Sequence, residues 1–296
     1  MWRPLQRFGD LVKFEHTVFA LPFAYVGSLM GADGHPTAAQ WMWITLAMVG
    51  ARTAGMTLNR LIDRTFDARN PRTRDRAIPA GRVSASAARL IAIAACALLV
   101  VAAARLNALA LALTPVALML LVAYSYLKRF TAFAHFGLGL VLACAPAGGW
   151  IAVRGSLGLA PCLVSAAVLL WVAGFDILYA CLDVDFDRTE KLHSVPARWG
   201  IGRAMTLARA LHVAAVALLA AAGAVLGLSP LYFGGVSVVT VLLGYEHSLV
   251  SPDDLSKMDQ AFFTMNGWVS VTLFTFTWLS YRLSSTQEIV QWIIAR

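Results

Sequence analysis

Charged residues are scarce in this sequence: Asp, Glu, Lys and Arg together make up 14% of its 296 residues, whereas 59% are hydrophobic. Soluble domains typically have about 25% charged residues, because their surface must face water. The composition therefore excludes an ordinary soluble protein. The mean hydropathy of +0.69 indicates instead that most of the molecular surface lies in lipid.

Cysteine is also rare, with four residues and no CxxC pair or neighbouring histidine cluster. This spacing argues against a disulfide framework and against a zinc site. Each cysteine lies within or beside an apolar run, where we expect it to act as a small, buried hydrophobic residue. The four are Cys96, Cys144, Cys162 and Cys181.

The formal net charge of +8 does not predict a nucleic-acid partner. The basic residues are distributed between long apolar runs, whereas a nucleic-acid-binding domain gathers them on one soluble face. A membrane surface with its lipids is the partner that this distribution favours.

Nine apolar runs are long enough to be transmembrane helices, each of which needs about 20 residues. The sequence thus predicts an all-α integral membrane protein, folded as a single domain over residues 1–296. The eighth run is the weakest, because three glycines interrupt it. The runs cover residues 15–32, 39–60, 85–104, 107–127, 132–153, 158–180, 203–226, 230–248 and 260–281.

The basic residues also predict an orientation. With nine helices, the connections on the side of the N-terminus carry 16 Lys and Arg residues, and those on the opposite side carry 4. Because cytoplasmic loops are enriched in Lys and Arg, we expect a multi-pass protein of the cytoplasmic (inner) membrane with a cytoplasmic N-terminus.

Acidic residues recur at helical spacing where the second and sixth runs end. Asn59, Asp63 and Asp67 follow one another at intervals of four and share one helix face, as do Asp183 and Asp187. Arg52 lies on the same stripe as the first group, and Asp176 on the same face as the second.

Two carboxylates 4 Å apart repel by about 4 kcal/mol at an effective dielectric of 20. Stacked aspartates at a membrane boundary therefore favour a bound cation, and oxygen ligands without His or Cys favour Mg²⁺. The alternative is that these aspartates are solvated and paired with neighbouring arginines. Two such motifs on the same side of the membrane, each followed by a basic loop, favour the metal.

Basic residues beside the acidic motifs are suitable partners for phosphate oxygens. They include Arg72 after the first motif, Lys191 after the second and Lys128 at the end of the fourth run. Tyr124 and Lys128 share a helix face, and we single out Lys128 as a diphosphate contact. The enrichment of cytoplasmic loops in basic residues accounts for some of this group. Three histidines, His16, His135 and His193, show no partner pattern, and no functional role is assigned to them.

Together these residues resemble the UbiA superfamily of intramembrane prenyltransferases. Residues 59–67 (NRLIDRTFD), 70–73 (NPRT) and 76–82 (RAIPAGR) are similar to its first signature. Residues 179–187 (YACLDVDFD) are similar to its second, and the pair Tyr124 and Lys128 resembles its YxxxK element. The resemblance covers nearly the whole chain.

The resemblance implies nine transmembrane helices around a central cavity, closed on the cytoplasmic side by cap loops after the second and sixth helices. It implies that two Mg²⁺ ions bind a polyprenyl diphosphate, and that Arg72, Lys128 and Lys191 contact its phosphates. The metal ligands implied are Asn59, Asp63, Asp67, Asp183 and Asp187.

Residues 13–22 (KFEHTVFALP) and 70–73 resemble quinone-pathway members most closely. These prenylate 4-hydroxybenzoate, for ubiquinone, or 1,4-dihydroxy-6-naphthoate, for menaquinone, and the two acceptors remain alternatives. In the expected reaction the arene attacks an allylic cation. Arg52 is a candidate to bind the acceptor carboxylate, or else forms a structural ion pair. Asp176 or Asp183 is a candidate to take the ring proton.

Other functions fit less well. In a secondary transporter, ionisable residues would lie near the membrane midplane, whereas the aspartates here lie at one membrane face. The CDP-alcohol phosphotransferases carry an Asp-Gly-x2-Ala-Arg element that this sequence lacks. Other UbiA branches, which prenylate haem or chlorophyll precursors, remain alternatives.

Overall fold

The computed structural model describes residues 17–294, and side chains from residue 20 to residue 283. Residues 13–16 of the predicted quinone-pathway stretch thus lie outside the described residues. Within the described part, nine helices of 15 or more residues coincide with the nine predicted runs. They are α2 (Thr17–Gly31), α3 (Ala38–Ile62), α5 (Ala85–Leu106), α6 (Ala108–Leu127), α7 (Ala134–Arg154), α8 (Leu159–Ala180), α11 (Ile201–Val225), α12 (Pro230–Ser248) and α13 (Asn266–Ile294).

Capping residues set several of the helix ends. The side chains of Thr37, Ser84 and Asn107 accept hydrogen bonds from the first-turn backbone of α3, α5 and α6. Gly155 ends α7 at φ 67°, a left-handed conformation that glycine adopts without steric cost. Sequence-local signals therefore set the boundaries between successive spans.

Five of the helices in the described part are long and apolar enough to cross a membrane by length and composition alone: α5, α6, α7, α8 with its extension, and α11. The other four long helices are shorter or more polar; α3, for example, contains Arg52 and Arg60. These two arginines point into the bundle: Arg60 is buried, and Arg52 lines the cavity described below.

Small residues allow the helices to approach closely. A Cβ atom at Gly27 of α2 would lie 2.0 Å from the carbonyl oxygen of Pro146 in α7, and one at Gly149 would lie 1.9 Å from that of Ala24. Close backbone contact of this kind is typical of helices packed in lipid. All four cysteines are free thiols, as predicted, but only Cys181 is buried: Cys162 is exposed, and Cys144 is accessible where it lines the cavity described below.

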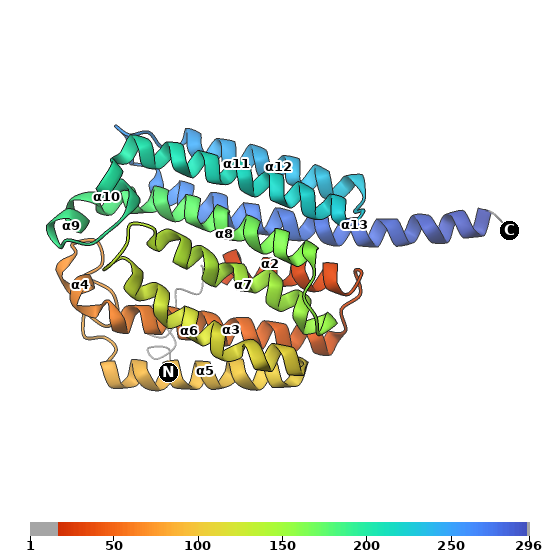
Figure 1. Ribbon diagram of the computed structural model, residues 1–296, viewed down its shortest axis with the longest axis horizontal. Coiled ribbons are helices and arrows are strands. Elements are labelled where there is room, and N and C mark those ends of the chain that lie inside the picture. The colour runs from red at the N-terminus through yellow and green to blue at the C-terminus, as the bar shows by residue number, and fades with distance from the viewer. Residues whose placement is uncertain (1–16, 295–296) are drawn as a thin grey trace.

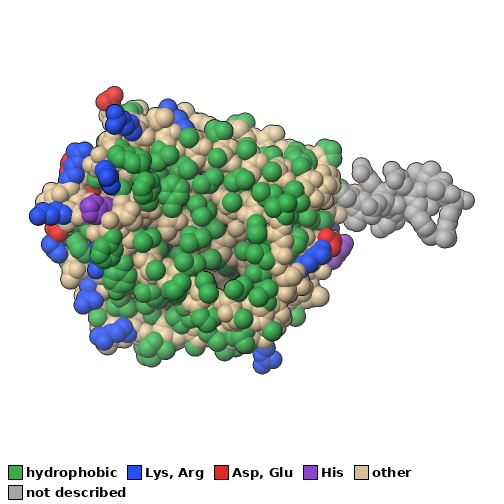
Figure 2. Space-filling view, in the orientation of Figure 1, with side chains coloured by type: hydrophobic (Ala, Val, Ile, Leu, Met, Phe, Trp, Pro, Cys, Tyr) green, Lys and Arg blue, Asp and Glu red, His purple; other side chains and the backbone are tan. Residues whose placement is uncertain are grey.

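Short helices gather at one end of the bundle (Figure 1). They are α4 (Arg64–Arg69), the 3₁₀ turn η2 (Cys181–Asp183), α9 (Val184–Thr189) and α10 (Val195–Trp199), all from the connections after α3 and α8. Figure 2 shows that Lys and Arg side chains are concentrated at this same end, while the flank of the bundle is largely hydrophobic. The predicted cap loops therefore close one end of the molecule.

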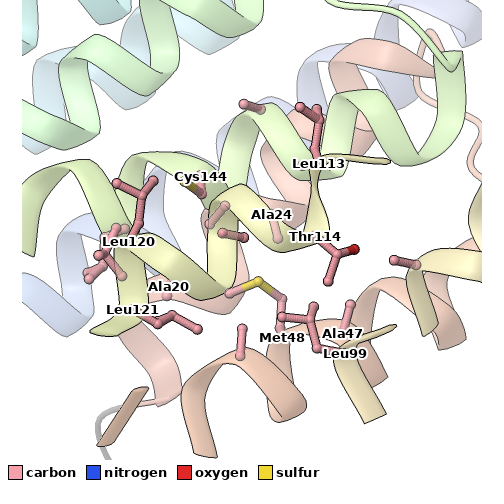
Figure 3. A pocket seen from close by; sticks show the side chains of 18 of the residues that line it. Ala20, Ala24, Ala47, Met48, Leu99, Leu113, Thr114, Leu120, Leu121 and Cys144 are labelled. Carbon is pink, nitrogen blue, oxygen red and sulfur yellow. The ribbon is translucent and has the colours of Figure 1, made fainter. Parts of the chain in front are cut away.

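A cavity of about 350 Å³ lies between α2, α3, α5, α6 and α7. Its walls are almost entirely apolar, as the labelled side chains in Figure 3 show, with Met48, Leu99 and Leu121 facing the opening. Polar groups enter it at Thr114, Tyr124 and Arg52. The expected central cavity is thus present, inside the part of the bundle formed by the first five long helices.

Candidate active site

The first acidic motif lies across a break between two helices. α3 ends at Ile62, Asp63 has φ −92° and ψ 5°, and α4 begins at Arg64. Helical hydrogen bonds nevertheless continue through the break, since the Asp63 amide donates to the Asn59 carbonyl over 2.9 Å and the Asp67 amide to Asp63 over 2.8 Å. The sequence predicts one continuous helix end, and the structure divides it while keeping the side chains together.

The second motif has the same construction. α8 ends at Ala180, the 3₁₀ turn η2 carries Asp183, and α9 carries Asp187. Asp187 is buried, whereas Asp185, two residues earlier and on the opposite helix face, is exposed. Each motif therefore places its first aspartate (Asp63 or Asp183) at the helix break and its second (Asp67 or Asp187) in the short helix that follows.

The loop after the first motif connects it to the second. The Asn70 side chain donates to Asp183 Oδ1 over 3.1 Å, and Arg72 Nε donates to the same oxygen over 3.0 Å. The Arg72 guanidinium also lies over the Tyr179 ring, 4.8 Å from its centroid. Arg69 pairs with Glu190 at 2.7 Å. The predicted meeting of the two motifs is thus made by side chains of residues 69–72.

Three of the four motif aspartates have arginine partners. Arg76 donates to both oxygens of Asp67, at 2.8 and 3.0 Å; Arg129 donates to Asp63 at 3.1 Å; and Arg72 pairs with Asp183. Burial raises the pKa of Asp63, while the charges of Lys128 and Arg129 oppose that shift. These carboxylates are therefore held together by surrounding positive charge.

Lys128 lies between the motifs at the end of α6. Its ammonium group interacts electrostatically with both Asp63 and Asp187. Its carbonyl oxygen accepts a 2.7 Å hydrogen bond from the His193 amide of the second cap loop. Lys191 is different: it is exposed between α9 and α10, at φ 55°, and has no ion pair among the side chains the structure describes. The structure thus places Lys128, but not Lys191, in the centre of the acidic group.

Asn59, Tyr124 and Arg52 extend from the acidic group towards the cavity. The Asn59 amide donates to Asp63 Oδ2 over 3.1 Å and to Ser125 over 3.2 Å. Tyr124 interacts electrostatically with Arg52, Asp63 and Asp176, and both Tyr124 and Arg52 line the cavity. Arg52 Nε is buried and has no hydrogen-bond partner among the described residues.

Asp176 has a partner that the sequence did not reveal. His135 Nδ1, near the start of α7, lies 2.6 Å from Asp176 Oδ2 in α8. The two residues are 41 positions apart, and their contact results from the packing of α7 against α8. No local spacing signals such a pair, which is why the sequence shows no partner pattern for His135.

The donor chemistry of the site suits Mg²⁺, because the two motifs contribute five oxygen-bearing side chains with no cysteine or histidine among them. Lys128 interacts with one aspartate of each motif. Within the described residues, no three Asp, Glu, His or Cys side chains are placed so that they could hold a metal ion by themselves. Mg²⁺ characteristically binds through one or two carboxylates together with waters and substrate phosphates. The arrangement therefore fits ions shared with a diphosphate and does not fit a metal held by protein alone.

The sequence matches the UbiA prenyltransferase family over residues 20–269. The chain belongs to this family. It is 30% identical over 274 residues to the 4-hydroxybenzoate octaprenyltransferase of Aromatoleum aromaticum, covering 92% of this chain and 90% of that protein. It is 28% identical over 286 residues to the protein of the same name from Cupriavidus necator, covering 96% and 100%.

Solved structures of UbiA homologues have the same fold. The apo structure of a homologue from Aeropyrum pernix K1 has a TM-score of 0.81 and 35% identity, covering 88% of this chain and 96% of that one. A homologue from Archaeoglobus fulgidus bound to DMAPP and Mg²⁺ has a TM-score of 0.72 and 19% identity, covering 93% and 99%. The chain is accordingly a multi-pass membrane enzyme that transfers prenyl groups.

Proposed function

We propose that this UbiA enzyme transfers a polyprenyl group from a polyprenyl diphosphate to 4-hydroxybenzoate, a step of ubiquinone biosynthesis. The names of its curated relatives favour this acceptor over 1,4-dihydroxy-6-naphthoate. In the reaction, the allylic C–O bond breaks and its electron pair leaves with the diphosphate. A ring carbon of the acceptor then forms the new C–C bond and loses its proton.

The position of Lys128 carries the proposal. Its ammonium group interacts with one aspartate of each motif, and Tyr124, one turn earlier on α6, lines the apolar cavity. A diphosphate held between the motifs would thus lie at the mouth of a cavity suited to its hydrocarbon chain. Stabilising the charge of the leaving group at such a water-poor boundary is an effective form of catalysis.

Asn59, Asp63, Asp67, Asp183 and Asp187 are the residues that would hold Mg²⁺ on the substrate diphosphate. When bound, Mg²⁺ would supply positive charge that neutralises the departing group. The UbiA homologue from Archaeoglobus fulgidus, whose structure contains DMAPP and Mg²⁺, supports this choice of metal and of a prenyl diphosphate as ligand. The arginines that now pair with Asp67, Asp63 and Asp183 would shift part of their contact to phosphate oxygens.

Arg72 and Lys128 would contact those phosphate oxygens. Arg72 offers a planar guanidinium suited to two oxygens at once, and its present partner is a carboxylate, Asp183. Lys191 would join them only if the loop between α9 and α10 brings its exposed side chain inward.

Arg52 would bind the carboxylate of the aromatic acid. Arg52 lines the cavity and interacts electrostatically with Tyr124, and its buried Nε has no hydrogen-bond partner among the described residues. A buried guanidinium without a full set of acceptors costs free energy unless a ligand supplies them. Asp176, which also interacts electrostatically with Tyr124, would take the ring proton. Asp183 is the less favoured candidate, because Arg72 and Asn70 already donate hydrogen bonds to it.

We also propose that the end bearing α4, α9 and α10 faces the cytoplasm and that residues 1–296 form a single domain. The concentration of Lys and Arg at this end supports the orientation (Figure 2). A cytoplasmic site would give direct access to a water-soluble aromatic acid.

The acceptor is tested by incubating the purified protein with Mg²⁺, a long-chain polyprenyl diphosphate and each of the two acids separately. We expect prenylated 4-hydroxybenzoate and little or no prenylated naphthoate. Product with the naphthoate alone would refute 4-hydroxybenzoate as the acceptor and indicate a role in menaquinone synthesis. Absence of product with either acid, from folded protein that binds the diphosphate, would indicate another UbiA branch.

A further inference from the structure

His135 occupies a buried position between the acidic group and the second cap loop. Its side chain is 6% exposed, and its two ring nitrogens have different partners. Nδ1 lies 2.6 Å from the Asp176 carboxylate, and Nε2 lies 3.3 Å from the backbone amide of Val195, at the start of α10.

These two contacts determine where the ring carries its proton. The Val195 amide can only donate, so Nε2 must accept and cannot itself carry hydrogen. The proton therefore lies on Nδ1, from which the imidazole donates to Asp176. A hydrogen bond to a carboxylate is stronger and more directional than one between neutral groups. The carboxylate of Asp176 is thereby held in one orientation.

The same ring also holds the cap loop. Ser194 precedes Val195, caps α10 and hydrogen-bonds through its hydroxyl to Asp187 of the second motif. His193, one residue earlier, donates its amide to the carbonyl of Lys128. Residues 193–195 are thus fixed to Lys128, Asp187 and His135, and His135 is the member of this set that also contacts Asp176.

We propose that His135 is a positioning residue for prenyl transfer: it orients the Asp176 carboxylate towards the aromatic ring and keeps residues 193–195 closed over the site. The inference rests on the proposed function. As the C–C bond forms, the ring proton moves to the free oxygen of Asp176, and the electrons of the C–H bond restore the aromatic ring. The proton leaves to water when the product departs, and His135 keeps its own proton throughout.

Three variants separate the two contacts. Asn places a side-chain N–H near the position of Nδ1, whereas Gln places a polar group near Nε2. His135→Asn should retain turnover to within about fivefold, while His135→Gln and His135→Leu should lower kcat by about ten- to a hundred-fold, a part of what a general base contributes. In His135→Gln, which keeps a polar group near the Val195 amide, the KM for the polyprenyl diphosphate should stay within about twofold, because the proposed role of Asp176 concerns the acceptor. His35→Leu, an exposed histidine away from the site, is the matched control.

A double-mutant cycle tests whether His135 acts through Asp176. In an Asp176→Asn background, His135→Gln should lower kcat by less than about twofold, because residues that act as a unit are not additive. Additive losses, equal losses in the Asn and Gln variants, or unchanged turnover in His135→Gln would each overturn the proposal. The cycle uses Gln, so it does not depend on the Leu variant folding. Absence of transfer by the wild type with any acceptor would instead refute the proposed function, and this inference with it.

Discussion

At the scale of single residues, the site consists of carboxylates that are buried yet surrounded by cations. Asp63 shows the balance: burial raises its pKa, whereas Lys128 and Arg129 favour its charged form. A site of this kind is prepared for a ligand that carries both metal charge and phosphate oxygens. In the proposed reaction, the same cations would exchange part of their contact with carboxylates for contact with phosphate oxygens.

The two motifs should be equally necessary. Asp63→Ala and Asp187→Ala should each reduce turnover by at least about a hundred-fold, since each removes a group that acts on the leaving diphosphate. Asp185→Ala, in the same motif but exposed, is the matched control and should leave turnover unchanged. Thermal unfolding in detergent should show that all three variants fold. Near-normal turnover of either test variant would refute the metal-site assignment.

Arg52 should act on the acceptor and not on the donor. Arg52→Ala should raise the KM for 4-hydroxybenzoate by about ten- to a hundred-fold, the range expected for a lost hydrogen bond to a charged group. The KM for the polyprenyl diphosphate should change much less. Arg52→Lys keeps the charge but not the planar pair of donors, so it should recover only part of the affinity. A larger effect on the donor would remove this role and favour a structural ion pair.

At the scale of helices, the sequence predicts where the spans lie but not how they break. Eight of the nine runs appear within a few residues of their predicted bounds, because crossing lipid requires a long apolar stretch. The ninth, predicted over residues 260–281, appears as α13 (Asn266–Ile294), which begins later and continues well beyond the predicted end. The breaks at Asp63 and at Cys181–Asp183 were not predicted, since the four-residue spacing of the aspartates continues through them. Where side chains keep their four-residue spacing across a break, the sequence pattern is the same as that of an unbroken helix.

Side-chain contacts between different helices also could not be predicted from the sequence. The contact of His135 with Asp176 depends on how α7 packs against α8. The arginines near the motifs were recognised as a group, but the pairing of Arg129 with Asp63 required the relative placement of α3 and α6. Residue types and spacing therefore predict the composition of the site, and helix packing determines its partners.

The cavity beside α7 should bind the hydrocarbon chain of the donor. Gly148 lines it, and a Cβ atom there would meet no other atom within 4 Å, so Gly148→Phe fills space without disturbing helix packing. We expect kcat/KM for a long-chain donor to fall by at least about tenfold, with a geranyl donor within about twofold of wild type.

Met119→Phe is the control for this change, because Met119 is 60% exposed on α6 and does not line the cavity. Steady-state kinetics with donors of both lengths gives the comparison. Equal losses for the two donors, or no loss for the long one, would place the chain elsewhere in the bundle.

At the scale of the whole molecule, the chain combines two environments in one bundle. An apolar flank and cavity suit a lipid substrate, while one end gathers the acidic motifs, their arginines and the cap helices α4, α9 and α10 (Figures 1 and 2). Reaction at this boundary would join a substrate dissolved in lipid to one dissolved in water. This arrangement explains the low content of charged residues: they are needed for the reaction at one end of the bundle, whereas the rest of the surface lies in lipid.

The central claim is that the two motifs form one Mg²⁺-dependent prenyl-transfer site. Its most direct test is transfer of a polyprenyl group to 4-hydroxybenzoate by the purified wild type, measured before EDTA, after EDTA and after Mg²⁺ is restored. We predict that EDTA reduces product to background and that Mg²⁺ restores it, while the protein stays folded throughout. Undiminished transfer in EDTA would contradict the claim.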